Sequence, residues 1–582
     1  MIIREDLEIL QGQSASSGIV IGHAYVRKVD NETIIPRTLI SEQNIPEEMS
    51  RLTKAQDMVA EELELVRKKI EENLGPSYSD IISAQIAILR DHEIIKEVRA
   101  YIEEHHVNVA FAYRVVVNQY VELLEDHASE YFRERVADIR DIRQRVLRAL
   151  ISKQTVLSSL ELDTPTIFIA KELNPADIMM LVTENVLGFI TEFGGKTSHA
   201  SILARAMKVP MIIGVKDATF TLESGQRIIL DANQGNVLIQ PSQETLDQYA
   251  REMDNLQAQE LKYQAESHKK AVTQDGFQLK LSANISLPFE VDDIIKYGGD
   301  GVGLYRTEYL YLMKQHLPDE EELFREYVRV VKSLPDQEVI IRTIDLGGDK
   351  MSALWDLNIR NEANPFMGYR AIRICLDHPQ VFITQIRAIL RSSAFGKVCL
   401  LIPMITHLEQ LTESLEIIER VKRDLEHEKI AFDRNIKTGI MVETPSVVMN
   451  IEAFAEKADY FSIGTNDLTQ YSLAVDRGNE RVTKIYNHYD PAIIKMLQKI
   501  IDAGHRSGIP VYICGEMGSE EQALYLLLAM KADGVSVAPR YLGTVRNFIN
   551  RQNQKKAAKH LNEILCMKNR KDIIDAIDKL IG

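Results

Sequence analysis

The sequence after Gly276 alternates short apolar segments with helix-like segments, and this alternation occurs eight times. The apolar segments, each a candidate strand, are residues 279–284, 301–305, 339–343, 398–404, 438–443, 460–464, 511–515 and 534–537. Eight strand and helix units of this length predict a closed parallel (β/α)8 TIM barrel, with its reactive side chains at the C-terminal ends of the strands. An open doubly wound sheet is the alternative, but it would not explain why so many strand ends carry reactive groups.

Polar and charged side chains lie at the C-terminal ends of these candidate strands or shortly after them. They are Asn284, Arg306, Arg342, Glu443, Asn466, Asp467 and Cys514. Glu443 and Asp467 follow consecutive strands, so both carboxylates should reach one barrel mouth. Such oxygen ligands suit Mg²⁺, which takes further ligands from water and substrate oxygens. A single acid at a strand end more commonly pairs with an arginine, so the magnesium prediction depends on the pair.

Arginines recur near the same predicted barrel mouth. They are Arg306, Arg342, Arg370 and Arg477. Guanidinium groups bind phosphate and carboxylate with two parallel hydrogen bonds and stabilise the charge of a phosphoryl group in transfer. One arginine beyond a strand is usually a solvated or ion-paired surface group. Several at one mouth require an anionic ligand to offset their repulsion.

Cys514 is expected as the last residue of the seventh strand, where a thiol can give a proton to, or take one from, a carbon centre. Cys375, Cys399 and Cys566 are expected to be inert. The four cysteines contain no C-x-x-C pair, so neither a disulfide framework nor a zinc ribbon is indicated.

The first half of the chain contains one histidine in an unusual context, His199 in GGKTSHAS. Glycines allow a sharp strand-to-helix turn, and Thr197 or Ser198 can cap the helix. His199 then lies in the first helical turn, where free N–H groups and the positive end of the helix dipole favour an anion. Lys196 and Arg205 can add positive charge. Taken alone, a histidine at a helix start is more often a capping or surface residue.

The remaining segments predict that the first half of the chain is an α/β domain interrupted by a helical insertion. Residues 18–26 are predicted as a short strand pair, and residues 166–169, 187–191 and 227–230 as further strands. Between them, apolar residues at three- and four-residue spacing predict a helical insertion with a break at Gly75 and Pro76. A long helix is predicted after Pro241. The predicted domains are 1–35 with 155–240 (α/β), 36–154 (helical), 241–270 (linker helix) and 271–582 (barrel).

The net charge and the hydropathy of the chain limit the kinds of binding partner and the cellular location that are expected. The formal net charge is -16, which argues against nucleic acid or an anionic membrane and suits a basic protein. No apolar stretch approaches the ~20 residues needed to span a bilayer, and the start of the sequence does not resemble a signal peptide. A cytoplasmic location is expected.

Several long segments together resemble the enzyme I family of the bacterial phosphoenolpyruvate-dependent sugar phosphotransferase system, the phosphoenolpyruvate-protein phosphotransferases. The resemblance covers the whole chain. Its segments are GGKTSHASILARAMKVPMIIGV, GVGLYRTEYLYL, NPFMGYRAIRI, MVETPSVV and FSIGTNDLTQYSLAVDRGN. The last of these is long and highly specific.

The resemblance implies roles for individual residues. His199 would be the phosphorylated nucleophile, and Cys514 would protonate the enolate to give pyruvate. Glu443 and Asp467 would bind Mg²⁺. The helical insertion would dock the small phosphocarrier HPr, the barrel would form a homodimer, and the linker would act as a hinge. Phosphoenolpyruvate would be held by Arg306, Arg342, Asn466, Asp467 and Arg477.

Two departures and two alternatives accompany this resemblance. Lys196 stands where the family usually has arginine, which keeps the charge but loses the bidentate fork, and Ala200 stands where threonine is common.

A dikinase-like enzyme shares the histidine segment and the barrel but needs an additional ATP-binding domain, for which this chain has no stretch left. A regulatory phosphoprotein that senses phosphoenolpyruvate is the other alternative, and the intact barrel residues argue against it.

Overall fold

The computed structural model describes most of the chain. Its described residues are 8–27, 35–74, 76–125, 130–152, 164–182, 185–195, 198–312, 316–347, 362, 364–477, 479 and 481–581. They form two compact units, Met1–Leu256 and Gln257–Gly582.

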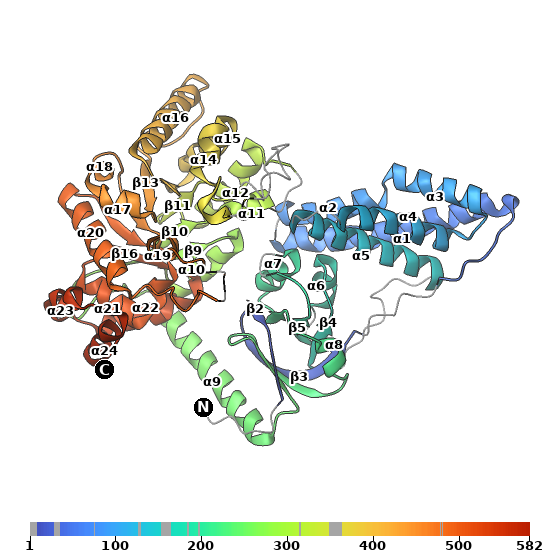
Figure 1. Ribbon diagram of the computed structural model, residues 1–582, viewed down its shortest axis with the longest axis horizontal. Helices are drawn as coiled ribbons and strands as arrows, with labels where there is room; N and C mark the ends of the chain where they lie inside the picture. Colours follow the sequence, from blue (N-terminus) through green and yellow to red (C-terminus); the bar gives the residue numbers. More distant parts are fainter. Residues whose placement is uncertain are drawn as a thin grey trace. The chain divides into compact units, whose positions relative to one another are not determined.

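The second unit is a closed barrel of eight parallel strands, as predicted (Figure 1). The strands are β9 (Lys280–Ile285), β10 (Gly301–Tyr305), β11 (Glu338–Arg342), β12 (Lys397–Ile402), β13 (Lys437–Val442), β14 (Phe461–Ile463), β15 (Val511–Ile513) and β16 (Gly534–Val537). Each pairs with its neighbour in the sequence, and β16 pairs with β9 from Gly534↔Lys280 to Val537↔Ala283. This closure directs all eight C-terminal strand ends to one mouth.

Apolar side chains fill the barrel interior. Cys399, Met441 and Tyr460 belong to one buried cluster there, together with Cys514. The Tyr460 ring fits because Gly439 has no side chain, and a Cβ at Gly439 would lie 2.5 Å from that ring. A filled interior leaves no channel, so a substrate can reach the polar strand ends only from the mouth.

Helices surround the strands of this unit. They are α10 (Val291–Tyr297), α11 (Glu308–Leu312), α12 (Glu320–Ser333), α14 (Ile372–Asp377), α15 (Pro379–Ser392), α16 (Leu408–His427), α17 (Pro445–Met449), α18 (Ile451–Ala455), α19 (Thr465–Leu473), α20 (Pro491–Ser507), α21 (Glu521–Ala529), α22 (Leu542–Arg551), α23 (Gln554–Cys566) and α24 (Arg570–Ile581). Long examples such as α12 and α20 bury one apolar face and leave charged residues outside.

The first unit contains an eight-stranded mixed sheet in the order β1-β8-β7-β3-β4-β5-β6-β2. The strands β3 to β6 are parallel to one another, and the other pairs are antiparallel. The strands are β1 (Ile9–Gln11), β2 (Gln13–Ser16), β3 (Ile19–Val26), β4 (Thr166–Ala170), β5 (Val186–Thr191), β6 (Met211–Ile213), β7 (Arg227–Asp231) and β8 (Asn236–Ile239). The strands predicted at 166–169, 187–191 and 227–230 are confirmed.

The strand pair predicted for residues 18–26 is wrong, because β3 is one continuous strand. Gly22 lies inside this strand and pairs with Ile228. Its missing side chain serves close packing, since a Cβ there would lie 3.0 Å from the Pro165 carbonyl oxygen.

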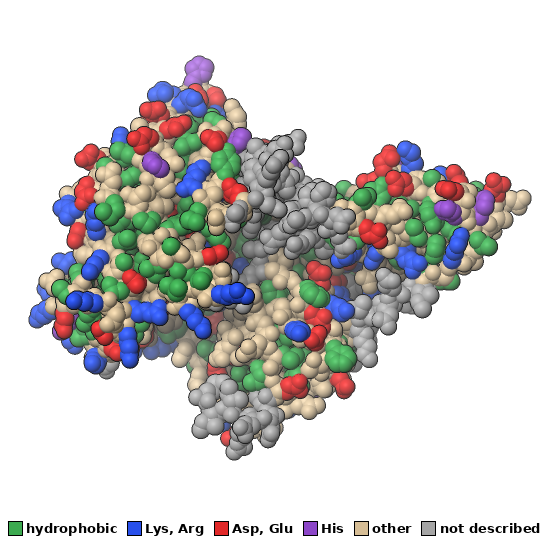
Figure 2. Space-filling view, in the orientation of Figure 1, with side chains coloured by type: hydrophobic (Ala, Val, Ile, Leu, Met, Phe, Trp, Pro, Cys, Tyr) green, Lys and Arg blue, Asp and Glu red, His purple; other side chains and the backbone are tan. Residues whose placement is uncertain are grey.

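Helices make up the rest of the first unit. They are α1 (Ile45–Leu74), α2 (Pro76–Leu89), α3 (His92–His105), α4 (Val109–Glu125), α5 (Glu130–Ser152), α6 (Pro175–Leu181), α7 (His199–Ala206), α8 (Ala218–Thr221) and α9 (Gln243–Ala265). The predicted helical character of the insertion is confirmed, while Gly75 lies outside the described residues. In the face shown in Figure 2, acidic and basic side chains are interspersed over these helices.

A buried ion cluster joins the inserted helices to the α/β part of this unit. The Arg145 side chain of α5, 3% exposed, pairs with Glu62 of α1 and with Asp141 at 2.9 Å. It also lies 3.6 Å from Asp177 of α6. Because a buried charge without its partners is costly, this cluster favours one fixed placement of α1 and α5 against α6.

The long helix predicted after Pro241 is α9, and the boundary between the two units falls inside it. Leu246 and Tyr249 of its first half pack on the sheet of the first unit. In its second half, Glu260 accepts hydrogen bonds from Lys296 and from the Tyr297 hydroxyl. Residues 254–259 between these anchors are exposed.

Candidate active site

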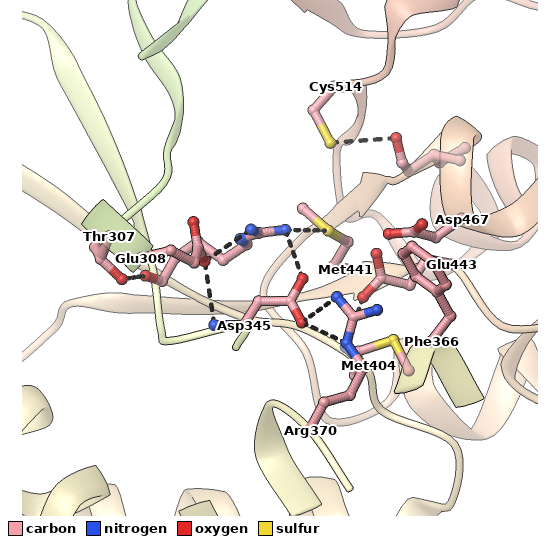
Figure 3. Close-up of polar contacts among 12 residues, drawn as sticks. Thr307, Glu308, Asp345, Phe366, Arg370, Met404, Met441, Glu443, Asp467 and Cys514 are labelled. Atoms are coloured by element: carbon pink, nitrogen blue, oxygen red, sulfur yellow. Dashed lines mark hydrogen bonds and ion pairs between the residues drawn. The ribbon is translucent and has the colours of Figure 1, made fainter. Parts of the chain in front are cut away.

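The barrel mouth brings acidic, basic and thiol side chains together from several strands (Figure 3). Figure 3 places Glu443 beside Asp467 and Asp345 beside Arg370, while Cys514 lies at the top of the view, across the group from Arg370. The residues predicted from strand ends that this view labels, Glu443, Asp467 and Cys514, therefore lie at one barrel mouth. Asn284 and Arg342 lie in the last two residues of β9 and β11, within the candidate strands at 279–284 and 339–343.

Glu443 and Asp467 form a carboxylate pair, and the Asp467 side chain is 13% exposed. Glu443 follows β13 directly and is fully buried, and its Oε1 accepts a hydrogen bond from the Met404 backbone N–H at 2.6 Å. Asp467 lies in the first turn of α19. Among the described residues, Glu443 Oε2 and Asp467 Oδ1 have no hydrogen-bond partner. Burial raises the pKa of Glu443 well above its usual range, and Asp467 and Asp345 raise it further.

These two unpartnered oxygens fit a cation. A buried carboxylate oxygen without a donor is costly unless a positive charge or a donor reaches it. Across the described part of the chain, no group of three or more His, Cys, Asp or Glu side chains is placed to hold a metal ion. Mg²⁺ commonly takes only one or two carboxylates and fills its other positions with water and substrate oxygens, so the pair agrees with that mode of binding.

Arg342 lies deep in the mouth between two acids. Its Nη2 is 2.8 Å from Glu308 Oε1, and its Nη1 is 3.2 Å from Asp345 Oδ2. Arg370 donates to Asp345 Oδ1 from Nε at 3.0 Å and from Nη2 at 2.7 Å. Asp345 therefore connects two arginines and fixes their relative position before any ligand arrives.

Sequence reasoning missed Glu308 and Asp345. Both lie within segments that were singled out for their arginines, YRTEY and IIRTIDLGG. Clustered arginines need acidic partners in the protein as well as an anionic ligand. Acidic residues within three positions of a strand-end arginine were therefore the sequence feature that could have identified these two residues.

Arg306 and Arg477 are the accessible arginines of the group. Arg306 follows β10 and is exposed. The Arg477 side chain is 39% exposed, with its Nη2 3.6 Å from Asp467 Oδ1. Asn466 lies beside Asp467 in α19, and its Oδ1 accepts from the Glu516 backbone N–H at 3.4 Å. These side chains can meet an incoming anion without first breaking a buried ion pair.

Cys514 is the residue after β15, which ends at Ile513, so its prediction as the last strand residue was off by one. The side chain is almost fully buried, and Sγ donates to the Ile463 carbonyl at 3.3 Å. Burial raises the pKa of Cys514 to about 11, which keeps the thiol protonated near neutral pH. Asn284 Nδ2 donates to the Cys514 carbonyl at 3.0 Å and to the Ser536 carbonyl at 2.9 Å.

The His199 segment folds as a strand-to-helix turn in the first unit. His199 is the first residue of α7, and the Ser198 hydroxyl caps this helix by accepting from the Ser201 backbone N–H at 3.3 Å. Gly194 has φ 130°, a conformation that favours glycine. Arg205 Nε donates to the Ala15 carbonyl at 3.3 Å. Ser198, of the two predicted capping residues, is the cap, and Lys196 and Thr197 lie outside the described residues.

Within the described ranges, no helix combines the length and the apolar character that crossing a membrane requires.

Comparisons with known proteins extend over nearly the whole chain. Three family descriptions match: "PEP-utilising enzyme, N-terminal" at residues 11–135, "PEP-utilising enzyme, mobile domain" at 162–235 and "PEP-utilising enzyme, PEP-binding domain" at 260–554. Proteins named phosphoenolpyruvate-protein phosphotransferase from Priestia megaterium and Bacillus subtilis (strain 168) are each 36% identical over 568 residues. The alignments cover 98% of this chain, and 98% and 99% of those proteins.

A solved structure described as an NMR solution structure of an enzyme I protein shares 31% identity with this chain. The match covers 42% of this chain and 98% of that chain, with a TM-score of 0.36.

Replacing Glu443 by glutamine should raise stability. Glu443→Gln keeps the size of the side chain but removes one of three neighbouring acidic charges from the interior. We expect the midpoint of thermal unfolding in metal-free buffer near neutral pH to rise by ~2 °C or more, since repulsion and desolvation are relieved. Differential scanning calorimetry measures this change.

Glu308→Gln is the matched control, because its carboxylate has a buried arginine partner and its loss should lower the midpoint. A lower midpoint for Glu443→Gln would contradict the account of the carboxylate pair.

Proposed function

Because the chain belongs to the family of phosphoenolpyruvate-protein phosphotransferases, we propose that it carries a phosphoryl group from phosphoenolpyruvate through His199 to the phosphocarrier HPr, releasing pyruvate. This is the first step of the sugar phosphotransferase system. The observation that carries the proposal is the barrel mouth, where unpartnered carboxylate oxygens lie among arginines inside the segment that matches a PEP-binding domain.

Phosphoenolpyruvate carries a phosphate and a carboxylate, and the mouth has groups for both. Accessible Arg306 and Arg477 supply guanidinium forks, and Arg342 supplies a fixed positive charge deeper in the mouth. Asn466 adds an amide donor. Asp467 completes the proposed set, because its carboxylate would contact both the substrate and the metal ion.

Glu443 and Asp467 would hold Mg²⁺. When bound, this ion supplies positive charge that offsets the charge on the phosphoryl oxygens. The raised pKa of Glu443 supports the assignment, because a carboxylate destabilised by its acidic neighbours gains most from a cation.

The chemistry divides into two bond exchanges. A ring nitrogen of His199 attacks phosphorus in line, forming a P–N bond while the P–O bond to the enolate breaks. The enolate oxygen then re-forms a carbonyl, and C3 takes the proton from Cys514 Sγ. Protonation traps the product as pyruvate and leaves a thiolate, which regains a proton from water before the next turnover.

The domains predicted from the sequence divide this work. Residues 1–35 with 155–240 carry His199, residues 36–154 dock HPr, and residues 271–582 bind phosphoenolpyruvate. Residues 241–270 link them, and the exposed middle of α9 suits a hinge that lets His199 visit both donor and acceptor. The resemblance further supports a cytoplasmic location and a homodimer formed through the barrels.

The two other functions are less well supported. A dikinase-like enzyme or a regulatory phosphoenolpyruvate sensor could use the same histidine and barrel. The full-length similarity to proteins named for transfer to a protein favours the protein phosphotransferase.

Loss of His199 should abolish transfer. Full-length protein incubated with Mg²⁺ and labelled phosphoenolpyruvate should acquire acid-labile label, and HPr should remove it. His199→Ala should label neither itself nor HPr, while His23→Ala, which changes an exposed histidine of β3, should behave as wild type. Autoradiography with and without HPr makes the measurement. The assignment would be falsified if His199→Ala still passed label to HPr, and labelling from ATP would favour the dikinase.

Loss of Cys514 should slow turnover without preventing binding. Cys514→Ala removes the proposed general acid, so we expect pyruvate release in the presence of HPr to fall by ~100-fold or more. Cys399→Ala, which removes another thiol from the same barrel cluster, should stay within about threefold of wild type on the same principle. A Cys514→Ala protein with undiminished pyruvate release would remove Cys514 from the mechanism.

A further inference from the structure

Gln385 of α15 is fully buried and contacts two of the segments that form the barrel mouth. Its Oε1 accepts a hydrogen bond from the Ile344 backbone N–H at 2.9 Å. Its Nε2 donates to the Thr307 hydroxyl at 3.1 Å and to the Tyr327 hydroxyl at 3.1 Å. Because the Ile344 N–H can only donate, the amide oxygen must face it, and the orientation of the whole amide is fixed.

The two contacted segments carry arginines of the proposed substrate site. Thr307 directly follows Arg306, and Ile344 is two residues after Arg342. The Thr307 hydroxyl, which accepts from Gln385, donates in turn to the Arg342 backbone carbonyl at 3.0 Å (Figure 3). A continuous chain of hydrogen bonds therefore runs from Gln385 through Thr307 to Arg342.

Charged groups also join these two segments. Glu308 Oε1 accepts from Arg342 Nη2 at 2.8 Å and from the Asp345 backbone N–H at 3.1 Å. An anionic substrate competes with Glu308 for the Arg342 guanidinium, so this connection can change when the substrate binds. Gln385 contacts only hydroxyl groups and a backbone N–H, for which the substrate does not compete. Its contacts can therefore persist in the bound state.

We propose that Gln385 is a positioning residue, which holds the ends of β10 and β11 at a fixed separation so that Arg306 and Arg342 meet the substrate together. The inference rests on the function proposed above, in which both arginines bind phosphoenolpyruvate. Gln385 acts through Thr307 and Ile344 and does not touch the substrate. Without it, the two arginines would have to be ordered when the substrate binds, and that ordering weakens binding.

The test removes the hydrogen bonds of Gln385 and keeps the length of its side chain. We expect Gln385→Met to raise the KM for phosphoenolpyruvate about tenfold, because both arginines are less well placed before binding. Its kcat should stay within about threefold of wild type, because the arginines hold the substrate both before and during transfer. Steady-state pyruvate release with Mg²⁺ and HPr measures both constants.

Gln554→Met is the matched control. Gln554 is also a buried glutamine of the barrel unit, and its Nε2 donates to the Leu528 carbonyl at 3.3 Å. Both variants lose buried hydrogen bonds, so both should have a lower midpoint of thermal unfolding. Gln554→Met should nevertheless leave KM and kcat within about twofold of wild type. Equal KM increases in the two variants, or an unchanged KM in Gln385→Met, would overturn the inference.

Thr307→Val tests the chain of hydrogen bonds at its middle. It removes the hydroxyl that joins Gln385 to Arg342, so KM should rise here too, and adding it to Gln385→Met should raise KM little further. An unchanged KM in Thr307→Val would contradict the inference even if Gln385→Met failed to fold. KM increases that multiply in the double variant would contradict it as well.

The reaction from the acceptor side separates positioning from general damage. Labelled phospho-HPr should label His199 of Gln385→Met as it does the wild type, because that exchange does not use the barrel mouth. Slower labelling of the variant from phospho-HPr would show a general defect and overturn the inference. Absence of phosphoenolpyruvate-dependent labelling in the wild type would instead overturn the proposed function itself, so the two failures are distinguishable.

Discussion

The pairing of β16 with β9 closes the barrel, and the arrangement of the mouth depends on that closure. Parallel strands in a closed ring place every C-terminal end at the same rim. Residues separated by more than a hundred positions in the sequence thus become neighbours, as Arg342 and Glu443 do. The apolar cluster around Met441 and Tyr460 fills the space beneath them, so the polar groups are confined to the rim.

Confinement sets the electrostatics of the mouth. Glu443 and Asp467 lie close together in a poorly solvated place, which raises the pKa of Glu443, whereas Asp345 is stabilised between two arginines. The structure thus holds one acid that is paired with two arginines, and a pair of acids in which one oxygen of each has no hydrogen-bond partner among the described residues. Such a pair costs stability in the free protein, and binding of the proposed cation and substrate would offset that cost, a usual trade between stability and function.

The sequence patterns predicted the barrel well because its units repeat and its strands are uniformly apolar. Strand ends then located Glu443, Asp467 and Cys514 without further information. Patterns of this kind do not show which side chains pair across the mouth, so Glu308 and Asp345 were missed. In the first half, residues 18–26 were predicted as a strand pair but form one strand, in which Gly22 lets two backbones approach closely.

The proposed role of His199 depends on the segment around it and on the resemblance to the phosphoenolpyruvate-protein phosphotransferases. Its helix start is formed as expected, with Ser198 as the cap. An isolated histidine at such a position indicates little. The barrel supports a phosphoryl-carrying role for His199, because its mouth has groups suited to a phosphoryl donor and α9 joins the two units across an exposed stretch. This arrangement suits two separate half-reactions. In the first, His199 would take the phosphoryl group at the barrel mouth, and in the second it would pass the group to HPr.

The most direct measurement is therefore to supply the phosphoryl group from either side to full-length Glu443→Gln protein. Labelled phospho-HPr should place label on His199 of this variant as in the wild type, because the barrel mouth takes no part in that exchange. Labelled phosphoenolpyruvate with Mg²⁺ should not label it within the time that saturates the wild type. Equal labelling of the variant from both donors would contradict the claim that the barrel mouth delivers the phosphoryl group to His199.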